Sequence, residues 1–291
     1  MPFTPLYDVP NSRRAYIVGQ GSTGVLMLHG FMGSPTRSRP LAQYLAQQGL
    51  TVHCPLLPGH GELPRRLHGV AKEAWLAEAQ EALATLRERC DEIILMAHSM
   101  GNVLAAHLAL TAKPTDTPFR GLVMLAPAYT VPSRAIYLLR LLRHVMPWLY
   151  PLWFRRLRGL VQDRLHDFDP ALDLDDPAIQ DRLPKLTRVP TGAIDEMRQT
   201  LDYGRRLWSR LDLPVIIFQG GRDIAVDPAN TRKLLAQLGS DEKQLVFLPE
   251  AGHELMRPFD PVHQRVWSEI AAFITAHSAV DVPPLTQEEA A

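Results

Sequence analysis

The sequence predicts an α/β fold in which a mostly parallel central sheet carries helices on both faces. Continuous apolar runs, typical of strands that are buried on both sides, alternate along the chain with longer helical segments. Loops rich in glycine and proline follow several of these runs, at the strand ends where open α/β sheets place their sites. The alternation stops over residues 130–209 and then resumes, which indicates an inserted helical cap.

The expected elements follow one another in the order that this fold requires. The segment after the first strand reads Gly19-Gln20-Gly21-Ser22-Thr23-Gly24 and matches the dinucleotide pattern G-x-G-x-x-G. That pattern must open a helix, whereas the next residues form an apolar strand, so we interpret the glycines as a turn between two strands. Strands are expected at residues 15–18, 25–28, 51–54, 93–97, 121–126, 213–219 and 244–248. Helices are expected at residues 36–48, which Gly49 ends, and at 70–89, 103–110, 228–238 and 260–277.

The domain boundaries follow from where this alternation stops. Residues 1–129 and 210–278 are expected to form the α/β core, with residues 130–209 as the cap. Residues 1–12 are proline-rich and expected to be irregular, and residues 279–291 are expected to form a disordered tail.

Composition argues against nucleic-acid-binding, secreted and membrane-spanning proteins. The chain has 291 residues, is 46% hydrophobic and carries 31 basic and 31 acidic residues, so nothing in its charge suggests a nucleic-acid partner. The N-terminus lacks the apolar core of a secretory signal, and no apolar run is long enough for a transmembrane helix, so we expect a cytoplasmic protein. Cys54 and Cys90 form no CxxC pair and are expected to be free thiols.

A sharp turn between a strand and a helix draws attention to Ser99. The apolar run of residues 93–97 ends at His98-Ser99-Met100-Gly101, and a helical segment begins at once. This is the layout of a nucleophile elbow, G-x-S-x-G, with Ala97 in place of the first glycine. The alternative is that Ser99 only caps the helix, a role that serine commonly fills.

Two further residues complete a catalytic triad in the expected order. A serine needs a base to take its proton and a carboxylate to orient that base. Asp223 follows the strand at 213–219, and His253 follows the strand at 244–248, which gives the order serine, acid, histidine. Asp227 competes for the acid role, but Asp223 lies closer to its strand end.

The other histidines at strand ends are assigned different roles. His29 and His60 precede Ser99, and His98 adjoins it, so we expect all three to make loop hydrogen bonds. His253-Glu254 begins like the zinc motif H-E-x-x-H, but Arg257 occupies the position of the second ligand, so no metal is expected.

An oxyanion site requires backbone N–H donors near Ser99. The elbow supplies the N–H of Met100, and the loop that begins at His29 supplies a second, which we assign to Phe31. Such donors contribute about 3–4 kcal/mol each to the transition state of acyl transfer.

These motifs together resemble the α/β-hydrolase family, most closely its bacterial carboxylesterases and monoacylglycerol lipases. The motifs are Leu26-Met27-Leu28-His29-Gly30-Phe31-Met32-Gly33, Pro58-Gly59-His60-Gly61, Ala97-His98-Ser99-Met100-Gly101, Gly221-Arg222-Asp223 and Gly252-His253. The resemblance covers about residues 15–129 and 210–278 and departs from the usual pattern at Ala97.

This resemblance implies hydrolysis of small-molecule carboxylic esters through an acyl-enzyme, with no metal or organic cofactor. Monoacylglycerols or short-to-medium acyl esters are the expected substrates. Two alternatives stay open: hydrolysis of a C–C bond or lactone by the same triad, or a protein that keeps the pocket and binds a small molecule without turnover.

The cap sequence permits two readings. Residues 131–160 hold six arginines and no acid among aromatic and aliphatic residues, and residues 167–176 hold five aspartates. A basic, apolar face of this kind suits contact with an anionic membrane. Alternatively, the apolar residues pack on the core while the arginines are solvated or pair with the aspartates. We favour the second reading, because Pro147 and Pro151 interrupt the segment and the acidic run is close.

Overall fold

The computed structural model describes residues 13–113, 115–131, 134–154, 158–159, 161–162, 165, 173–258, 260, 262–280 and 282. Residues 1–12, which we predict to be irregular, and nearly all of the predicted disordered tail lie outside the described residues.

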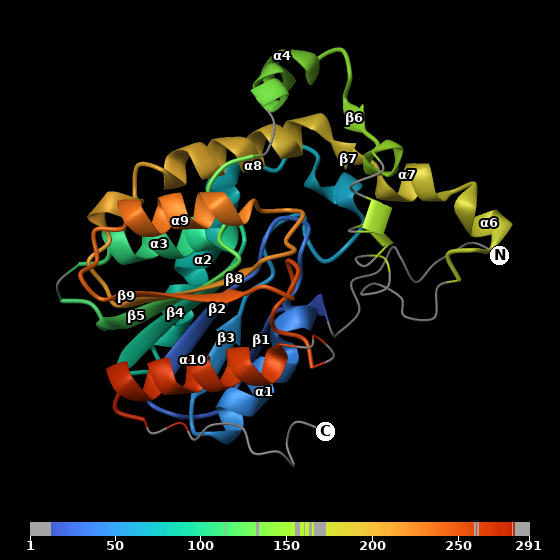
Figure 1. Cartoon of the computed structure of the whole chain (residues 1–291). Coiled ribbons are helices and arrows are strands. Elements are labelled where there is room, and N and C mark those ends of the chain that lie inside the picture. Colours follow the sequence, from blue (N-terminus) through green and yellow to red (C-terminus); the bar gives the residue numbers. More distant parts are fainter. Residues whose placement is uncertain are drawn as a thin grey trace.

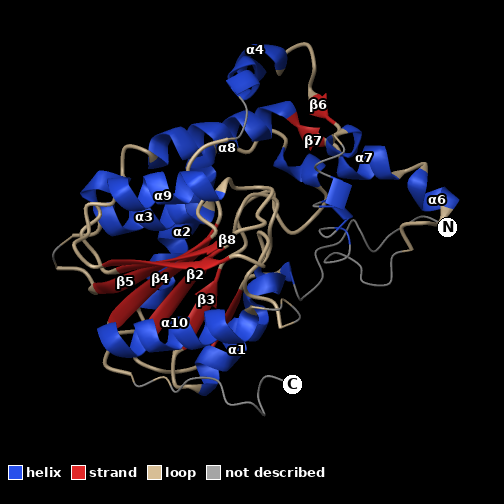
Figure 2. Ribbon diagram, in the orientation of Figure 1, coloured by secondary structure: helices blue, strands red, loops and turns tan. Residues whose placement is uncertain are grey.

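A seven-stranded sheet forms the centre of the molecule, with the order β1-β3-β2-β4-β5-β8-β9 (Figure 2). Every neighbouring pair is parallel except β1 and β3, which run antiparallel. This confirms the predicted fold class. The strands are β1 (Tyr16–Val18), β2 (Thr23–Leu28), β3 (Thr51–Cys54), β4 (Glu92–His98), β5 (Phe119–Leu125), β8 (Val215–Gly220) and β9 (Lys243–Leu248).

Helices cover both faces of the sheet. On one face lie α1 (Arg39–Gln47) and α10 (His263–His277), and on the other lie α2 (Lys72–Arg87), α3 (Gly101–Thr111) and α9 (Pro228–Gln237) (Figure 1). The sheet separates two large apolar clusters, one against each helix layer. The central strands are buried along their whole length, because both of their faces pack against helices.

Glycine and proline residues determine where the turn before β2 lies and where α1 begins. Gly19 has φ 83°, and a Cβ atom there would lie 1.9 Å from Leu50 O, so the predicted strand-to-strand turn requires glycine. The helix expected at 36–48 begins instead as a 3-10 turn, η2 (Pro35–Ser38), and becomes α1 at Arg39. Pro40 is the physical reason, because it lacks the N–H that a helix interior uses and is tolerated in the first turn.

The described part of residues 130–209, the predicted cap, forms short elements, as its prolines predict, together with one long helix. They are η4 (Arg134–Leu138), α4 (Leu139–Leu142), β6 (Trp148–Leu149), η5 (Pro151–Trp153), α6 (Pro177–Gln180), α7 (Leu183–Thr187), β7 (Val189–Pro190) and α8 (Thr191–Gly204). The small sheet of β6 and β7 was not predicted. In Figure 1, α8 lies over α3, and α4 lies above α8 on the side away from the sheet.

Helix α8 packs on the core rather than only on the rest of the cap. Ala193 and Leu201 belong to the same buried cluster as α2 and α3. A Cβ atom at Gly204 would lie 2.6 Å from Val103 Cγ2, so the helices approach each other closely. The N–H of Lys72 at the start of α2 donates to Glu196 Oε2 at 3.1 Å. These contacts join α8 to the sheet's helix layer.

We predicted that the apolar residues of segment 131–160 pack on the core, and this is wrong for several of them. Leu141, Val145 and Trp153 are 72%, 79% and 71% exposed, so they do not pack on the core. The described part of the acidic run makes local contacts, since the carboxylates of Asp173 and Asp176 accept backbone N–H groups two residues ahead.

Among the described arginines of this segment, Arg143 forms an ion pair, and its partner lies on α8. Arg143 Nη1 lies 3.7 Å from Asp195 Oδ2, so its partner comes from α8 and not from residues 167–176. Within the described residues, no helix is both long and apolar enough to cross a membrane.

Glu92 connects three separate parts of the core. Its Oε1 accepts bonds from Thr23 Oγ1 and from the Ala279 N–H, both at 2.7 Å, and its Oε2 accepts from Arg120 Nε at 2.8 Å. Burial raises the pKa of Glu92, but these donors outweigh burial and hold its pKa below the ordinary value.

Replacing Glu92 with glutamine should therefore lower the free energy of unfolding by about 1–3 kcal/mol at neutral pH. A depressed pKa in the folded state stabilises the fold fully above the unfolded value of about 4.3. That stabilisation is lost as the pH falls through the folded pKa. Urea unfolding of both proteins across the acid range checks this: their difference should shrink toward low pH, and a pH-independent difference would contradict it.

Candidate active site

Ser99 lies at the apex of the turn between β4 and α3. Its φ of 54° falls in the left-handed region, which costs a non-glycine residue about 1–2 kcal/mol. Backbone bonds hold this conformation: the Ser99 N–H donates to Leu125 O at 2.9 Å, and Ser99 O accepts the N–H groups of Asn102 at 3.2 Å and Ala128 at 3.3 Å. Ser99 is half-buried, whereas the residues on either side of it are buried. A strained, half-buried apex between a strand and a helix is the geometry of a nucleophile elbow.

Small residues let other segments pass close to this turn. A Cβ atom at Gly101 would lie 2.4 Å from Leu28 O, and one at Gly30 would lie 2.9 Å from Ser99 Cβ. Both positions therefore require glycine. Ala97 is buried between its sheet neighbours Leu28 and Met124, so its methyl group fits inside the sheet. This is why the elbow accepts alanine at its first small position.

Asp223 follows β8, and its carboxylate is fully enclosed. Oδ1 accepts the N–H groups of Ala225 and Val226, each at 2.8 Å, and Oδ2 accepts from His253 Nδ1 at 2.8 Å. The side chain is 0% exposed, and these donors compensate for the loss of water around it. Asp227 instead caps α9, where its Oδ1 accepts the Ala229 N–H at 2.9 Å. The structure thus places Asp223, and not Asp227, against His253.

The contact with Asp223 determines which nitrogen of His253 is free. A carboxylate only accepts hydrogen bonds, so Nδ1 carries the shared proton and Nε2 keeps its lone pair when the ring is neutral. His98 Nε2 lies 3.0 Å from His253 O and must donate to it, and the two rings lie 4.6 Å apart. The residue before Ser99 therefore fixes the loop that carries His253.

Ser99 itself makes no hydrogen bond to His253 among the residues that the structure describes. Such bonds are often long in a resting enzyme and shorten when substrate binds.

A polar pair behind Asp223, Gln219 and Thr231, was not predicted from the sequence. Gln219 Nε2 donates to Asp223 Oδ2 at 3.2 Å and to Gly220 O at 3.0 Å, and Gln219 Oε1 accepts the Thr231 hydroxyl at 2.6 Å. Both side chains are completely buried. Two acceptors beside Nε2 and a donor beside Oε1 fix one orientation of the amide. The available signal was a glutamine inside the otherwise apolar strand β8.

Two backbone N–H groups are free to face an oxyanion. Neither Phe31 N nor Met100 N donates to a backbone carbonyl in the described part of the chain. Met100 adjoins Ser99 at the start of α3, and Gly30 brings the Phe31 loop against Ser99. The Phe31 ring lies 6.1 Å from that of Trp75, which anchors the loop.

The remaining strand-end histidines make loop hydrogen bonds, as predicted. His29 Nε2 accepts the Leu57 N–H at 3.1 Å, and His60 Nδ1 lies 3.1 Å from Pro58 O. Together with the bond from His98 to the His253 loop, these contacts tie the strand-end loops to one another.

Neither a metal site nor a reactive thiol is found in the described residues. No three His, Cys, Asp or Glu side chains gather there to hold a metal ion. Cys54 and Cys90 are buried free thiols, as predicted. Burial raises the pKa of Cys54 to about 11 and also raises the pKa of Cys90, so neither is a thiolate at neutral pH.

Known proteins match this sequence over most of its length. A thermostable monoacylglycerol lipase from Bacillus sp. (strain H-257) is 26% identical over 254 residues, which cover 87% of this chain and 92% of that protein. A carboxylesterase from Bacillus subtilis (strain 168) is 24% identical over 251 residues, with coverage of 85% and 92%.

Solved structures of lipolytic enzymes share the fold of this chain. A structure reported for LipS and LipT, two metagenome-derived lipolytic enzymes, has a TM-score of 0.73 and 25% identity, and the match covers 93% of this chain and 100% of that chain. A soluble variant of monoglyceride lipase from Saccharomyces cerevisiae shares the fold, with a TM-score of 0.70, 18% identity and coverage of 91% of both chains. Residues 21–260 match the family described as serine aminopeptidase, S33. The chain belongs to this serine aminopeptidase S33 family and has the α/β-hydrolase fold.

Proposed function

We propose that the chain is a serine esterase that hydrolyses carboxylic esters through an acyl-enzyme. Ser99 is the nucleophile, His253 the general base and acid, and Asp223 the carboxylate that orients His253. The observation that carries this proposal is the 2.8 Å bond from His253 Nδ1 to Asp223 Oδ2, which leaves Nε2 as the basic nitrogen. The strained, half-buried Ser99 beside that loop supports it.

The reaction divides into two steps with balanced proton transfers. Ser99 Oγ attacks the ester carbonyl carbon while its proton passes to His253 Nε2. The tetrahedral intermediate then breaks its bond to the leaving oxygen, which takes that proton and departs as the alcohol. Water next attacks the acyl-enzyme and gives its proton to Nε2. Release of the carboxylic acid returns the proton to Ser99 Oγ.

Backbone donors would stabilise the charge that develops in both steps. The carbonyl oxygen becomes negative in each tetrahedral intermediate, and the N–H groups of Phe31 and Met100 are assigned to it. The fixed elbow and the packing of the Phe31 loop support this assignment, because preorganised donors need no rearrangement during reaction.

Monoacylglycerols or esters with short-to-medium acyl chains are the proposed substrates. A small apolar cavity of about 30 Å³ lies beside the Phe31 loop, between the core and the cap. Met32 and Leu67 line it from the core, and Leu165 and Leu186 line it from the cap. Its apolar lining suits the end of an acyl chain. The Bacillus relatives named as a monoacylglycerol lipase and a carboxylesterase point to the same class of substrate.

A substrate panel tests the proposal. p-Nitrophenyl esters of increasing acyl length, monoacylglycerols, a lactone and an amino-acid p-nitroanilide are compared with the same enzyme preparation. We expect an initial burst of p-nitrophenol equal to the enzyme concentration, hydrolysis of esters, and at most trace cleavage of the anilide. Absence of ester turnover would leave a binding protein, and faster cleavage of the anilide or lactone would reassign the reaction.

Removing the Thr231 hydroxyl should change the pH dependence of this reaction. In Thr231→Val, the Gln219 amide loses the bond that fixes its orientation, so Asp223 Oδ2 loses a well-aligned donor. The carboxylate then attracts the proton of the histidine imidazolium more strongly. The acid limb of the kcat/KM profile should move to higher pH by up to about half a unit.

Two matched variants separate this effect from a loss of stability. Thr231→Ser keeps the hydroxyl and should keep the wild-type profile. Asp227→Ala removes the cap of the same helix and should lower stability by about 1 kcal/mol without moving the acid limb. An unchanged limb in Thr231→Val would show that the Thr231–Gln219 pair does not influence Asp223.

A further inference from the structure

A buried ion pair links the two loops that carry the proposed oxyanion donor and the proposed base. Arg37 Nη1 pairs with Glu254 Oε1, and the two side chains are only 8% and 6% exposed. Arg37 lies in η2, which follows the loop that carries Phe31, and Glu254 directly follows His253. The catalytic steps proposed above use neither of these charged side chains.

The backbone of Arg37 is held by the core. Ser38 Oγ donates to Pro35 O at 3.0 Å and lies 2.9 Å from the Tyr16 hydroxyl on β1. The guanidinium of Arg39 lies 4.2 Å from the centre of the Tyr16 ring. The turn η2 continues directly into α1, which packs against the sheet. The Arg37 side chain therefore extends from a fixed support toward the loop of His253.

Other contacts hold the residues on either side of Glu254. His98 Nε2 donates to His253 O, and Trp267 Nε1 donates to Met256 O, each at 3.0 Å. These two bonds tie the loop to β4 and to α10. The ion pair of Glu254 adds a connection to the segment that follows the oxyanion loop.

A small cavity lies between these segments, beside the elbow. Its volume is about 20 Å³, and Gly30, Ala97 and His98 line it together with Arg37 and Glu254. Side chains do not fill this space, so van der Waals contacts do not set the separation of the two loops there. The ion pair spans the same region, and a charge-assisted contact with a guanidinium fixes direction as well as distance.

Stability alone does not account for this pair. The cost of removing two charges from water offsets their attraction, so a buried ion pair adds little stability compared with apolar residues of similar size. Removal of one partner is costly, because the other charge then stays buried without its counter-ion. The pair therefore contributes more to the geometry of the two loops than to the free energy of unfolding.

We propose that Arg37 and Glu254 are positioning residues, which hold the oxyanion loop and the loop of His253 at one separation. The role rests on the proposed esterase reaction, in which the Phe31 N–H and His253 Nε2 act on the same tetrahedral intermediate. A change in the separation of the two loops would weaken at least one of these contacts. A displacement of about 1 Å can lower the rate of an enzyme about 10²-fold.

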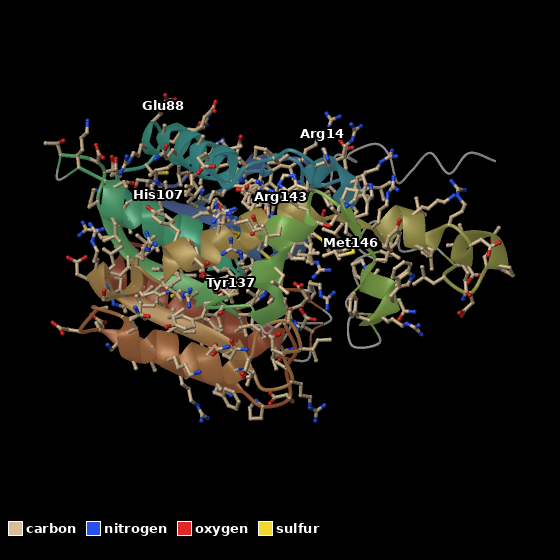
Figure 3. All side chains as sticks on the ribbon, turned by 90° about the horizontal axis from the view of Figure 1, so that it is seen from above. Arg14, Glu88, His107, Tyr137, Arg143 and Met146 are labelled. Atoms are coloured by element: carbon tan, nitrogen blue, oxygen red, sulfur yellow. The ribbon has the colours of Figure 1, made fainter. Side chains whose placement is uncertain are left out.

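A comparison of turnover with thermal stability tests this role. The variants are Glu254→Gln, Arg37→Met, Glu254→Leu, and Arg37→Met combined with Glu254→Leu. For each protein, kcat and KM are measured with p-nitrophenyl acetate, and Tm is measured by circular dichroism. Glu92→Gln is a matched control, because it changes a buried carboxylate at the opposite end of β4 from Ser99. Glu88→Gln makes the same change on an exposed side chain that points away from the end of α2 (Figure 3).

The variants should separate activity from stability. Arg37→Met and Glu254→Leu should each lower Tm by about 5–10 °C, because each leaves one buried charge without its partner. The double variant should recover most of that loss, since both charges are gone. Its kcat should nevertheless stay at least about tenfold below that of the wild type, with KM changed less than about twofold. Glu92→Gln should lower Tm without lowering kcat, and Glu88→Gln should change neither.

Glu254→Gln decides the question if the double variant does not fold. Glutamine keeps the length of the side chain and one acceptor oxygen, so this variant should fold. Its kcat should fall at least about threefold, because the contact with Arg37 loses its charge-assisted strength. A kcat equal to that of Glu92→Gln would contradict the positioning role.

Hydrogen exchange provides a readout that needs no turnover. In the double variant, or in Glu254→Gln if the double variant does not fold, peptides that cover residues 29–38 and 250–258 should both exchange faster than in the wild type. Peptides from α2 should keep their rate. Faster exchange in both loops, in a protein of nearly wild-type Tm, would show that the ion pair restrains them.

Three results would overturn this role. The first is a double variant that regains the wild-type kcat together with its Tm, and the second is wild-type exchange in both loops. The third is a shift of the acid limb of kcat/KM with an unchanged plateau, which would mean that the pair acts on the charge of His253 and not on its position. A wild-type chain that hydrolyses no ester would refute the proposed function, and the exchange measurement would still decide whether the pair links the two loops.

Discussion

Replacing Ser99 with alanine should lower kcat for p-nitrophenyl acetate by at least about 10⁴-fold. The substitution removes the attacking oxygen and leaves the oxyanion donors and the binding surface in place. Alanine also tolerates the left-handed backbone at φ 54° about as well as serine does, so the fold should survive. Steady-state kinetics measure the loss, and circular dichroism with thermal unfolding checks that the protein is intact.

Two controls make the Ser99 result specific. Ser209→Ala changes an exposed serine outside the site and should leave kcat unchanged. Mass spectrometry after treatment with a fluorophosphonate should find one covalent label on the wild-type chain, and none on Ser99→Ala. A Ser99→Ala protein that keeps most of its activity would refute the triad.

Replacing Asp223 with asparagine should lower kcat by about 10⁴-fold, whereas the same change at Asp227 should lower it less than threefold. The Asp223 carboxylate accepts the proton on His253 Nδ1 and so directs Nε2 toward Ser99. Asparagine would present an N–H donor there and favour the other tautomer. At Asp227, asparagine still caps α9, because its side-chain oxygen can accept the Ala229 N–H.

This pair of variants is informative because the two aspartates lie on the same loop. Asp223 and Asp227 lie four residues apart after β8, and the carboxylate of each accepts a backbone N–H group. If kcat fell only because a loop carboxylate was lost, each variant would lose kcat in proportion to its loss of unfolding free energy. Similar kcat values for the two variants would show that the 2.8 Å contact with His253 is not catalytic. Guanidinium unfolding of each variant provides the comparison.

The fold and the arrangement of the candidate site were predictable because their signals are local. Buried strands such as β4 and β8 are continuous apolar runs, and loops at their carboxyl ends must meet in a parallel sheet. Ser99, Asp223 and His253 each follow such a run, so their placement at one edge of the sheet needed no knowledge of packing. The choice of Asp223 over Asp227 also followed from distance to the strand end.

The features that escaped prediction depend on how distant elements pack. Gln219 contacts Thr231 only because α9 lies against β8 at one particular register, which neither segment encodes by itself. In the cap, Leu139 and Leu141 are both apolar residues of one short helix, yet one is buried and the other is 72% exposed. The sequence does not show which part of the core α8 covers. We therefore predicted that more apolar residues of segment 131–160 pack on the core than the structure shows.

Because α8 packs on the core, we expect it to open less readily than the rest of the cap. Ala193 and Leu201 lie in the same apolar cluster as the sheet, whereas the outer cap has a separate cluster of only three buried residues in the described chain: Val161, Leu165 and Leu183. Opening α8 would expose the central cluster, so its amide hydrogens should exchange with solvent only when the whole domain unfolds. The amides of α4, α6 and α7 should exchange through smaller openings that leave the sheet intact. The first openings of the described cap should therefore involve elements on the N-terminal side of Val189, while α8 stays on the core.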